Sequence, residues 1–327
     1  MKKLFVVLLS ILCMLTLAAC SSGGQGNEPA DQPEEKKAFN IGVVQLVQHA
    51  ALDAATEGFC ETVQAAFPDA VITVNNASGD PATCSTIAQG FVNDGVDLIM
   101  ANATPALQAA FSATGDIPIL GTSVTEYGVA LGIEDFNGVV GANVSGTSDL
   151  APLDQQAQMI LDLFPETKTV GIIFCSNEAN SKYQVEVVTD FLESKGIKVI
   201  AASFTDSNDI AFVTEDLCSQ IDVLYIPTDN QAASCSETIA NVVLEKKIPV
   251  IAGEEGICSL CGVATLTINY HDLGVVTGQM AVRILNGEAD IKDMPIEYFP
   301  DPIKKFNPAV CELLGVSVPE DFVAITQ

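Results

Sequence analysis

The chain has 327 residues, a length that suggests about two domains. Hydrophobic residues make up 48%, enough for sizeable cores, while 14 Lys and Arg stand against 42 Asp and Glu, giving a formal charge of -28. This acidity excludes nucleic acid as a partner, because nucleic-acid binding depends on basic residues that neutralise phosphates.

The first twenty residues differ from the rest. Two lysines precede an apolar run over 4–17, which the tetrad Leu17-Ala18-Ala19-Cys20 closes. The run is too short to span a membrane and is typical of a cleaved signal peptide over 1–20. The tetrad resembles a bacterial lipobox, which makes Cys20 the expected lipidation site. The alternative is an ordinary secretory signal with an incidental Cys. Residues 21–38, rich in Gly, Ser, Pro and Glu, predict a flexible tether.

From Phe39 onward, short apolar runs alternate with longer stretches of helical spacing. The runs predict strands at 41–45, 70–75, 97–101, 117–121 and 139–143, with helices at 51–67, 81–95 and 104–114 between the first four. The same cycle restarts with helices at 152–164, 181–195, 209–218 and 232–246 and strands at 169–174, 198–202, 223–226 and 249–252. A long helix over 270–285 and a tail with one more strand and a short helix complete the chain. Strands that alternate with helices predict parallel sheets, here in two Rossmann-like α/β lobes.

Ligands of open parallel sheets bind beyond the carboxyl ends of the strands. The loops at these ends are rich in Ser, Thr, Asn and Asp, residue types that equally favour helix N-caps. Because six such loops converge in two lobes, we interpret them as one cleft. The candidate ligand-binding residues are Gln45, Leu46, Val47, His49, Leu52, Thr104, Pro105, Ser123, Val124, Thr125, Asn177, Asn180, Ser181, Thr228, Asp229, Asn230 and Glu254.

At this point the chain resembles the type I periplasmic-binding-protein superfamily. Within it, the chain is similar to the ABC transporter substrate-binding lipoproteins whose members include tryptophan and tyrosine binders. The segments that carry the resemblance are IGVVQLVQHAALDAATEGF (41–59), NATPALQAA (102–110), SNEANS (176–181), YIPTDN (225–230), IPVIAGEE (248–255) and INYHDLGVVTGQMAVRIL (268–285).

The resemblance implies two lobes joined by three hinge crossovers, near 143–149, 266–270 and 290–298. The N-lobe then comprises 39–148 plus 270–290, and the C-lobe 149–269 plus 291–327. It further implies a monomer without a cofactor, held outside the cell membrane by its lipid. Closure of the lobes traps a ligand, which passes to an ABC permease driven by its ATPase.

The residues at the cleft restrict the ligand. The single Arg, Arg283, lies in the last long helix, so no bidentate Arg clamp is available for a phosphate or dicarboxylate. Helix N-termini with the side chains of Thr104, Ser123, Asn180 and Ser181 can hold one carboxylate. The acids near the cleft, Glu126, Glu178, Asp229, Glu254 and Glu255, suit an ammonium group.

Asp229 is the preferred ammonium partner, with a helix N-cap as its alternative role. Apolar residues and three tyrosines, Tyr127, Tyr183 and Tyr270, complete the wall. We therefore expect a zwitterion with an aromatic or other apolar side chain. Branched-chain amino acids, nucleosides or sugars remain alternatives. His49 either contacts the ligand or caps the first helix, and His271 is expected at the surface.

Eight cysteines remain once Cys13 and Cys20 are set aside. Most are expected to be buried free thiols. The pair Cys258 and Cys261 leaves three interpretations open: structural thiols, a local disulfide, or part of a metal site that lacks a second matched pair. No metal site is predicted. No motif of a hydrolase, nucleotide-binding enzyme or zinc protease is present, so no enzymatic activity is expected. A receptor for a membrane signalling system remains the alternative to transport.

Overall fold

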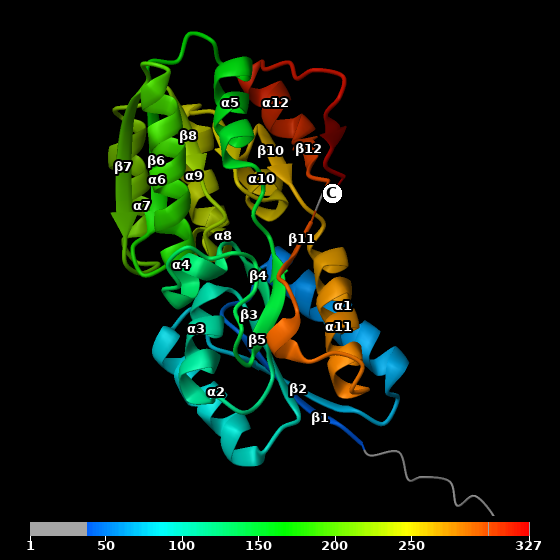
Figure 1. The fold of residues 1–327 in the computed structure, drawn as a ribbon. Helices are drawn as coiled ribbons and strands as arrows, with labels where there is room; N and C mark the ends of the chain where they lie inside the picture. Colours follow the sequence, from blue (N-terminus) through cyan, green and yellow to red (C-terminus); the bar gives the residue numbers. More distant parts are fainter. Residues whose placement is uncertain (1–37, 300, 327) are drawn as a thin grey trace, which may run out of the picture. The chain divides into compact units, whose positions relative to one another are not determined.

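The computed structural model describes residues 38–299 and 301–326. Two sheets, each covered by helices, form two lobes of one unit that spans Ala38–Gln327 (Figure 1). The predicted fold class of two α/β lobes with parallel sheets is confirmed. The predicted signal peptide, the lipidation site Cys20 and all but the last residue of the tether lie outside the described residues.

The first sheet has six strands in the order β11-β5-β4-β3-β1-β2, and every neighbouring pair is parallel. Its central strands are buried throughout or nearly so, as expected for a parallel sheet covered on both faces. The strands are β1 (Asn40–Gln45), β2 (Val71–Asn76), β3 (Leu98–Asn102), β4 (Ile119–Val124), β5 (Val144–Ser148) and β11 (Glu297–Tyr298).

The second sheet has seven strands in the order β13-β12-β10-β9-β8-β6-β7. It is parallel except where β12 pairs antiparallel with β10. The strands are β6 (Thr169–Cys175), β7 (Lys198–Phe204), β8 (Val223–Ile226), β9 (Val250–Ala252), β10 (Ala264–Thr267), β12 (Ile303–Phe306) and β13 (Val323–Ala324).

Helices cover both faces of the first sheet, with α2 and α3 on one side and α1 and α11 on the other (Figure 1). The pair α1 and α11 approaches closely through glycines. A Cβ on Gly58 would lie 2.2 Å from the His271 carbonyl oxygen, and one on Gly274 would lie 2.0 Å from that of Ala55. The elements are α1 (Ala50–Ala66), α2 (Pro81–Asp94), α3 (Thr104–Ala113), α4 (Tyr127–Leu131), α11 (Tyr270–Leu285) and the 3-10 helix η1 (Ile291–Asp293).

Two hydrophobic cores lie on the two faces of the second sheet. One includes residues of α7, α8, α9 and α10, and the other residues of α5, α6 and α12. The helices are α5 (Leu153–Leu163), α6 (Ala179–Ser194), α7 (Ile210–Cys218), α8 (Asn230–Ser234), α9 (Ser236–Lys246), α10 (Glu255–Cys261) and α12 (Pro308–Leu314).

Three sequence-based expectations need correction. The strand expected at 139–143 forms at Val144–Ser148, and the helix expected over 232–246 is interrupted at Cys235 between α8 and α9. Residues 291–298, expected in the C-lobe, belong with the first sheet, because β11 pairs with β5. The chain therefore leaves the first lobe after Ser148 and again after Tyr298, and enters it between Thr267 and Tyr270.

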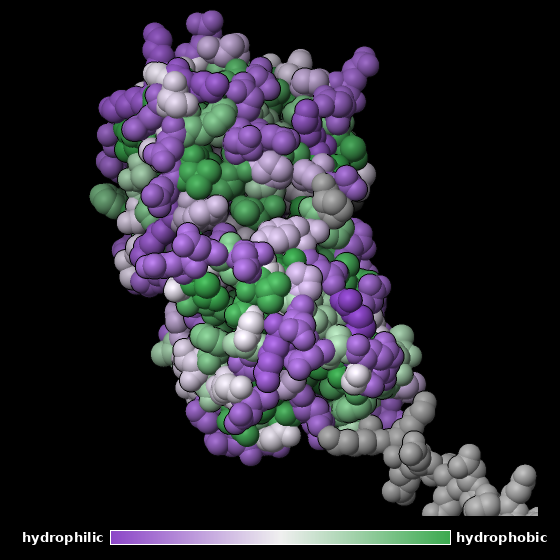
Figure 2. Space-filling view, in the orientation of Figure 1, coloured by the Kyte–Doolittle hydropathy of each residue, from purple (hydrophilic) through white to green (hydrophobic). Residues whose placement is uncertain are grey.

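Hydrophilic residues cover much of the face in Figure 2, with apolar residues in smaller groups between them. None of the helices described in the structure is long and apolar enough to cross a membrane. The eight cysteines within the described ranges are unpaired, six of them buried and Cys60 and Cys235 half-buried.

Candidate functional site

The loops at the carboxyl ends of the strands form one hydrogen-bonded network. In the first lobe, the Asp149 amide donates to the Val124 carbonyl oxygen at 3.3 Å, which joins the loops after β5 and β4. Tyr270 donates its hydroxyl to Asp149 at 2.9 Å and also hydrogen-bonds Thr228, after β8. The Asn180 amide then donates to the Thr228 carbonyl oxygen at 3.0 Å. The predicted convergence of loops from both sheets is therefore present in the structure.

Several buried side-chain oxygens in these loops lack a hydrogen-bond partner. Within the described residues the set comprises six atoms: Asn102 Oδ1, Thr104 Oγ1, Ser123 Oγ, Asp149 Oδ1, Asn180 Oδ1 and Thr265 Oγ1. Thr104, Ser123 and Asp149 stand within two residues of the ends of β3, β4 and β5, and Asn180 stands in the first turn of α6, the helix that follows β6. A buried polar atom without a partner is destabilising, so four of them at the same kind of position indicate a place for a polar ligand.

The backbone is unusual at the same two places in the first lobe. Ala103, immediately before α3, has φ 89° and ψ 158°, and Ser123 has φ 53°. Non-glycine residues rarely adopt positive φ, and such conformations cluster at ligand sites. Thr104 is the first residue of α3, whose N-terminus no side chain caps, and the Ala103 amide donates to the carbonyl oxygen of Thr122, the neighbour of Ser123, at 3.0 Å. This region combines two free hydroxyls with the positive end of a helix, a combination suited to a carboxylate.

Asp149 is the carboxylate with free capacity. It is 4% exposed, Oδ2 accepts from Tyr270, and Oδ1 has no partner. Burial raises the pKa of Asp149 to about 6, because removal from water penalises the charged form, and the hydrogen bonds from Tyr270, from Thr125 and from its own backbone amide only partly oppose this. A positively charged group at Oδ1 would remove that penalty.

Asp229, the preferred ammonium partner from the sequence, is instead used by the backbone. Oδ1 accepts from the Ala232 amide at 2.8 Å and Oδ2 from the Cys175 amide at 2.6 Å. Asp229 therefore caps the N-terminus of α8, the alternative role that the sequence left open. Burial raises the pKa of Asp229. The neighbouring Glu178 accepts from the backbone amides of Asn230 and Gln231. Burial, followed by the Asp229 charge, raises its pKa as well.

The other acids near the cleft also serve as caps. Glu254 accepts from the Gly256 and Ile257 amides at the start of α10, and burial raises its pKa to about 7. Glu126 accepts from Val129 at the start of α4. Glu255 forms an ion pair with Lys305 at 2.6 Å. The acidic loops predicted an ammonium site, whereas most of these carboxylates bind backbone N–H groups or a lysine.

His49 occupies the N-cap position of α1, but its side chain makes no capping hydrogen bond. Its Nε2 atom lies 3.2 Å from Asn230 Oδ1 in the other lobe. Burial lowers the pKa of His49 to about 4. His271 is partly exposed and pairs with Glu61, as expected for a surface residue. Arg283 pairs with Glu297 on the surface of the first lobe.

Most of the remaining candidates are buried at the predicted loops. Gln45 is held within the first lobe by Thr56 and Asp53. Asn177 is exposed and donates to the Thr205 carbonyl oxygen, so the structure does not bring it to the network. Tyr127 is fully buried in the first-lobe core and Tyr183 is half-buried, which leaves Tyr270 as the tyrosine of the network. The other buried candidates are Leu46, Val47, Leu52, Pro105, Val124, Thr125 and Ser181.

Sequence reasoning did not include Asp149 among the candidate site residues, although it used the residue to mark a crossover. The misplaced strand at 139–143 hid it, because a strand ending at Ser148 puts Asp149 at the carboxyl end of β5. It also missed Gln184, whose Oε1 accepts from the Thr228 amide and whose Nε2 donates to the Thr228 carbonyl oxygen.

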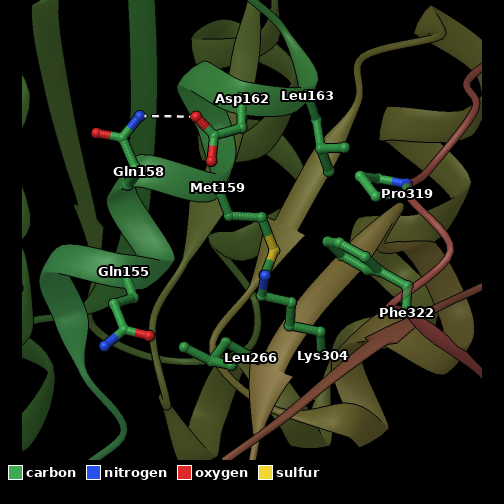
Figure 3. Close-up of a pocket in the computed structure, with 9 residues that line it drawn as sticks. All are labelled: Gln155, Gln158, Met159, Asp162, Leu163, Leu266, Lys304, Pro319 and Phe322. Carbon is green, nitrogen blue, oxygen red and sulfur yellow. Dashed lines mark hydrogen bonds between the residues drawn. The ribbon is translucent and has the colours of Figure 1, made fainter.

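Figure 3 shows a pocket elsewhere, on the second lobe between α5 and the C-terminal segment. Met159 and Leu163 of α5 face Phe322 and Pro319, and Lys304 reaches in from β12. No candidate residue from the sequence lines this pocket. Another pocket includes His49 and Glu254 together with residues of α8 and α9. In the described part of the chain, no group of three or more His, Cys, Asp or Glu is arranged to hold a metal ion.

Comparisons with known proteins agree with this architecture. A family model described as ABC transporter substrate binding protein matches residues 40–327. The tyrosine-binding protein of Clostridioides difficile (strain R20291) is 36% identical over 301 residues, which cover 90% of this chain and 87% of that protein.

Two solved structures are similar over most of their length. One, from Streptococcus pneumonia, is in complex with L-Trp. It is 32% identical with a TM-score of 0.82, covering 87% of this chain and 97% of that one. The other is a ligand-free, open structure of a substrate binding protein with adhesive properties from Clostridium difficile. It is 38% identical with a TM-score of 0.66, covering 88% of this chain and 99% of that one.

Proposed function

Because the chain belongs to the family of ABC transporter substrate binding proteins, we propose that it binds an aromatic amino acid between its two lobes and delivers it to the permease. The relatives with tyrosine and L-Trp in their names support this ligand class. The observation that carries the proposal is the set of buried, unpartnered oxygens at Thr104, Ser123, Asp149 and Asn180.

The ligand carboxylate binds at the first lobe in this proposal. Thr104 and Ser123 donate their free hydroxyls, and the N-terminus of α3 supplies a favourable dipole. The outward-facing Arg283 forms its ion pair elsewhere, which fits a ligand with a single carboxylate rather than two.

The ligand ammonium binds Asp149 Oδ1 and, from the second lobe, Asn180 Oδ1. Asp149 is preferred over Asp229, Glu178 and Glu254 because its free oxygen needs a donor, whereas theirs accept from protein N–H groups. Asp149 follows the last residue of β5 at the passage between lobes, so an ammonium there contacts the segment that joins them.

The ligand side chain packs against apolar residues of the first lobe and the ring of Tyr270. Leu46, Leu52 and Pro105 supply that apolar wall. We propose binding and release without a catalytic step, as in the family of substrate binding proteins to which the chain belongs.

We also propose that Cys20 carries lipid after signal cleavage and anchors the body outside the cell membrane through residues 21–37. The permease with its ATPase is the macromolecular partner, and the protein acts as a monomer. Globomycin-sensitive processing and loss of membrane association in Cys20→Ser test the anchor. Unchanged membrane association in Cys20→Ser would contradict it.

A thermal-shift screen of residues 38–327 tests the ligand class. These residues form a unit of their own, so the body is expected to fold without the N-terminal segment. Tyrosine, tryptophan or phenylalanine at a hundredfold excess over Kd stabilises the folded state by about 2.7 kcal/mol, a shift of several degrees. Branched-chain amino acids, nucleosides and sugars serve as the comparison panel. A shift with sugars or nucleosides alone would contradict the amino-acid proposal.

Affinity is expected to rise with pH through about 6. Only ionised Asp149 attracts an ammonium, and its pKa near 6 leaves about one tenth ionised at pH 5. The Kd at pH 5 is therefore expected to be about tenfold weaker than at pH 7.5, by calorimetry. Glu254 titrates nearby, with a pKa of about 7. Asp149→Asn assigns the effect, because it should remove the part of the pH dependence that is centred near 6 and leave only a contribution from Glu254. An equal pH dependence in Asp149→Asn would rule out Asp149 as the source.

A further inference from the structure

Two hydrogen bonds join the lobes away from the chain crossovers. His49 Nε2, after β1, lies 3.2 Å from Asn230 Oδ1 at the start of α8. Gln231 Nε2, one residue further on, donates to the Gly79 carbonyl oxygen after β2 at 3.1 Å. We call these four residues, His49, Gly79, Asn230 and Gln231, the latch. In Figure 1, α8 lies where the second lobe meets the first.

One buried carboxylate holds the second-lobe half of the latch. Glu178 is 2% exposed. Its Oε2 atom accepts from both the backbone amide and the side-chain amide of Asn230, and Oε1 accepts from the Gln231 backbone amide at 2.9 Å. Asn180 donates to the same carboxylate at 3.1 Å.

This arrangement fixes the chemistry of the contact with His49. Because the Asn230 side-chain NH₂ donates to Glu178, its Oδ1 atom faces the histidine. The amide oxygen of Asn230 can accept a hydrogen bond but cannot donate one, so the His49 ring must carry a proton on Nε2. The side-chain oxygens of Glu178 therefore orient the Asn230 side chain so that its Oδ1 atom faces His49. They also hold the Gln231 backbone where its side chain reaches the Gly79 carbonyl oxygen.

The latch forms while the two lobes are in contact. This structure superposes better on the L-Trp complex than on the ligand-free, open relative, although the open relative is more similar in sequence. A difference in the relative position of two lobes lowers such a score while each lobe keeps its fold. Contacts between lobes that are present only when they are closed slow opening and hence ligand release.

We propose that the latch sets the lifetime of the closed, ligand-bound protein, and that Glu178 is its positioning residue. The inference rests on the proposed function, because it concerns release from the same site. It assigns Glu178 a role distinct from ligand contact: its oxygens accept from Asn180, Asn230 and Gln231.

Gln231→Glu tests the latch without disturbing a core. The substitution keeps the shape of the side chain and replaces the donor with a carboxylate that faces the Gly79 carbonyl oxygen. The matched control is Gln64→Glu, since Gln64 Nε2 likewise donates to a carbonyl oxygen, that of Pro68, within the first lobe. The chain contains no Trp, so bound tryptophan is the sole indole reporter in stopped-flow fluorescence.

We expect Gln231→Glu to raise the dissociation rate of tryptophan about tenfold, with an association rate within about twofold of the wild type. His49→Phe should also raise the dissociation rate. Glu178→Gln should raise it more than either of the other two substitutions, because it disrupts both contacts of the latch. Gln64→Glu should leave both rates unchanged. Equal dissociation rates for Gln231→Glu and wild type would overturn the latch.

A wild-type protein that binds no aromatic amino acid would instead overturn the proposed function. In that case, small-angle X-ray scattering of the ligand-free protein tests the latch independently of the proposed function. Gln231→Glu is expected to have a larger radius of gyration than wild type and Gln64→Glu, because its lobes open more often. Identical scattering curves would overturn the latch in that case.

Discussion

Asp149→Asn is expected to weaken the binding of an aromatic amino acid by about a hundredfold or more. The substitution keeps the size of the side chain and its hydrogen bond with Tyr270 but removes the charge that we propose faces the ligand ammonium. Truncating one partner of a buried charge pair costs about 2–5 kcal/mol, most of it in the dissociation rate. Calorimetry on residues 38–327 at pH 7.5 measures the change.

The matched control is Asp154→Asn, five residues later on the exposed face of α5. It removes the same charge from the protein without touching the network and should leave the Kd unchanged. Without ligand, Asp149→Asn should be no less stable than wild type above pH 6, because burying the charge is unfavourable there. Binding at wild-type affinity in Asp149→Asn would exclude this residue as the ammonium partner.

Gly274→Ala is expected to destabilise the first lobe by about 3 kcal/mol or more. The added Cβ would lie 2.0 Å from the Ala55 carbonyl oxygen, and this backbone atom cannot turn aside as a side chain can. The two helices α1 and α11 must separate, which loosens the packing of Phe59 and Met280 in the core beneath them. Chemical denaturation followed by circular dichroism measures the loss.

Gly90→Ala provides the opposite case. Gly90 also lies inside a helix, α2, but a Cβ there meets nothing within 4 Å. The substitution should raise the free energy of unfolding by about 0.5–1 kcal/mol, because alanine restricts the unfolded chain and favours helix. If Gly274→Ala and Gly90→Ala changed stability alike, close packing of α1 on α11 would not be the reason for glycine at 274.

Elements with strong periodicity could be predicted from the sequence. The strand β8 and the helix α11 form at the residues expected, since apolar runs and helical spacing directly reflect burial. The strand β5 could not, because its sequence Val-Ser-Gly-Thr-Ser has one large apolar residue. Its place is fixed by pairing with β4 and β11 rather than by its own preference.

The candidate site was predictable at the level of loops and not of individual carboxylates. The loops after β3, β4 and β8 carry polar residues that the parallel topology brings together. Which acid stays free depends on the backbone amides that each one meets. Asp229 and Glu254 meet the first turns of α8 and α10, whereas Asp149 leads into α5 without capping it. The sequence alone does not contain those distances.

The acidic cleft thus has two kinds of carboxylate. Glu178, Asp229 and Glu254 stabilise the N-termini or side chains around the network, whereas Asp149 keeps one oxygen without a hydrogen-bond partner. Burial raises the pKa of all four. A raised pKa in this protein therefore marks burial, and the free oxygen is what distinguishes the proposed ammonium site.

A crystal structure of residues 38–327 with L-tyrosine or L-tryptophan tests the central claim most directly. The expected result places the ligand ammonium within hydrogen-bond distance of Asp149 Oδ1 and the ligand carboxylate at the hydroxyls of Thr104 and Ser123. A ligand bound in the pocket between α5 and Phe322, or one whose ammonium contacts Asp229 while Asp149 stays unpartnered, would contradict it.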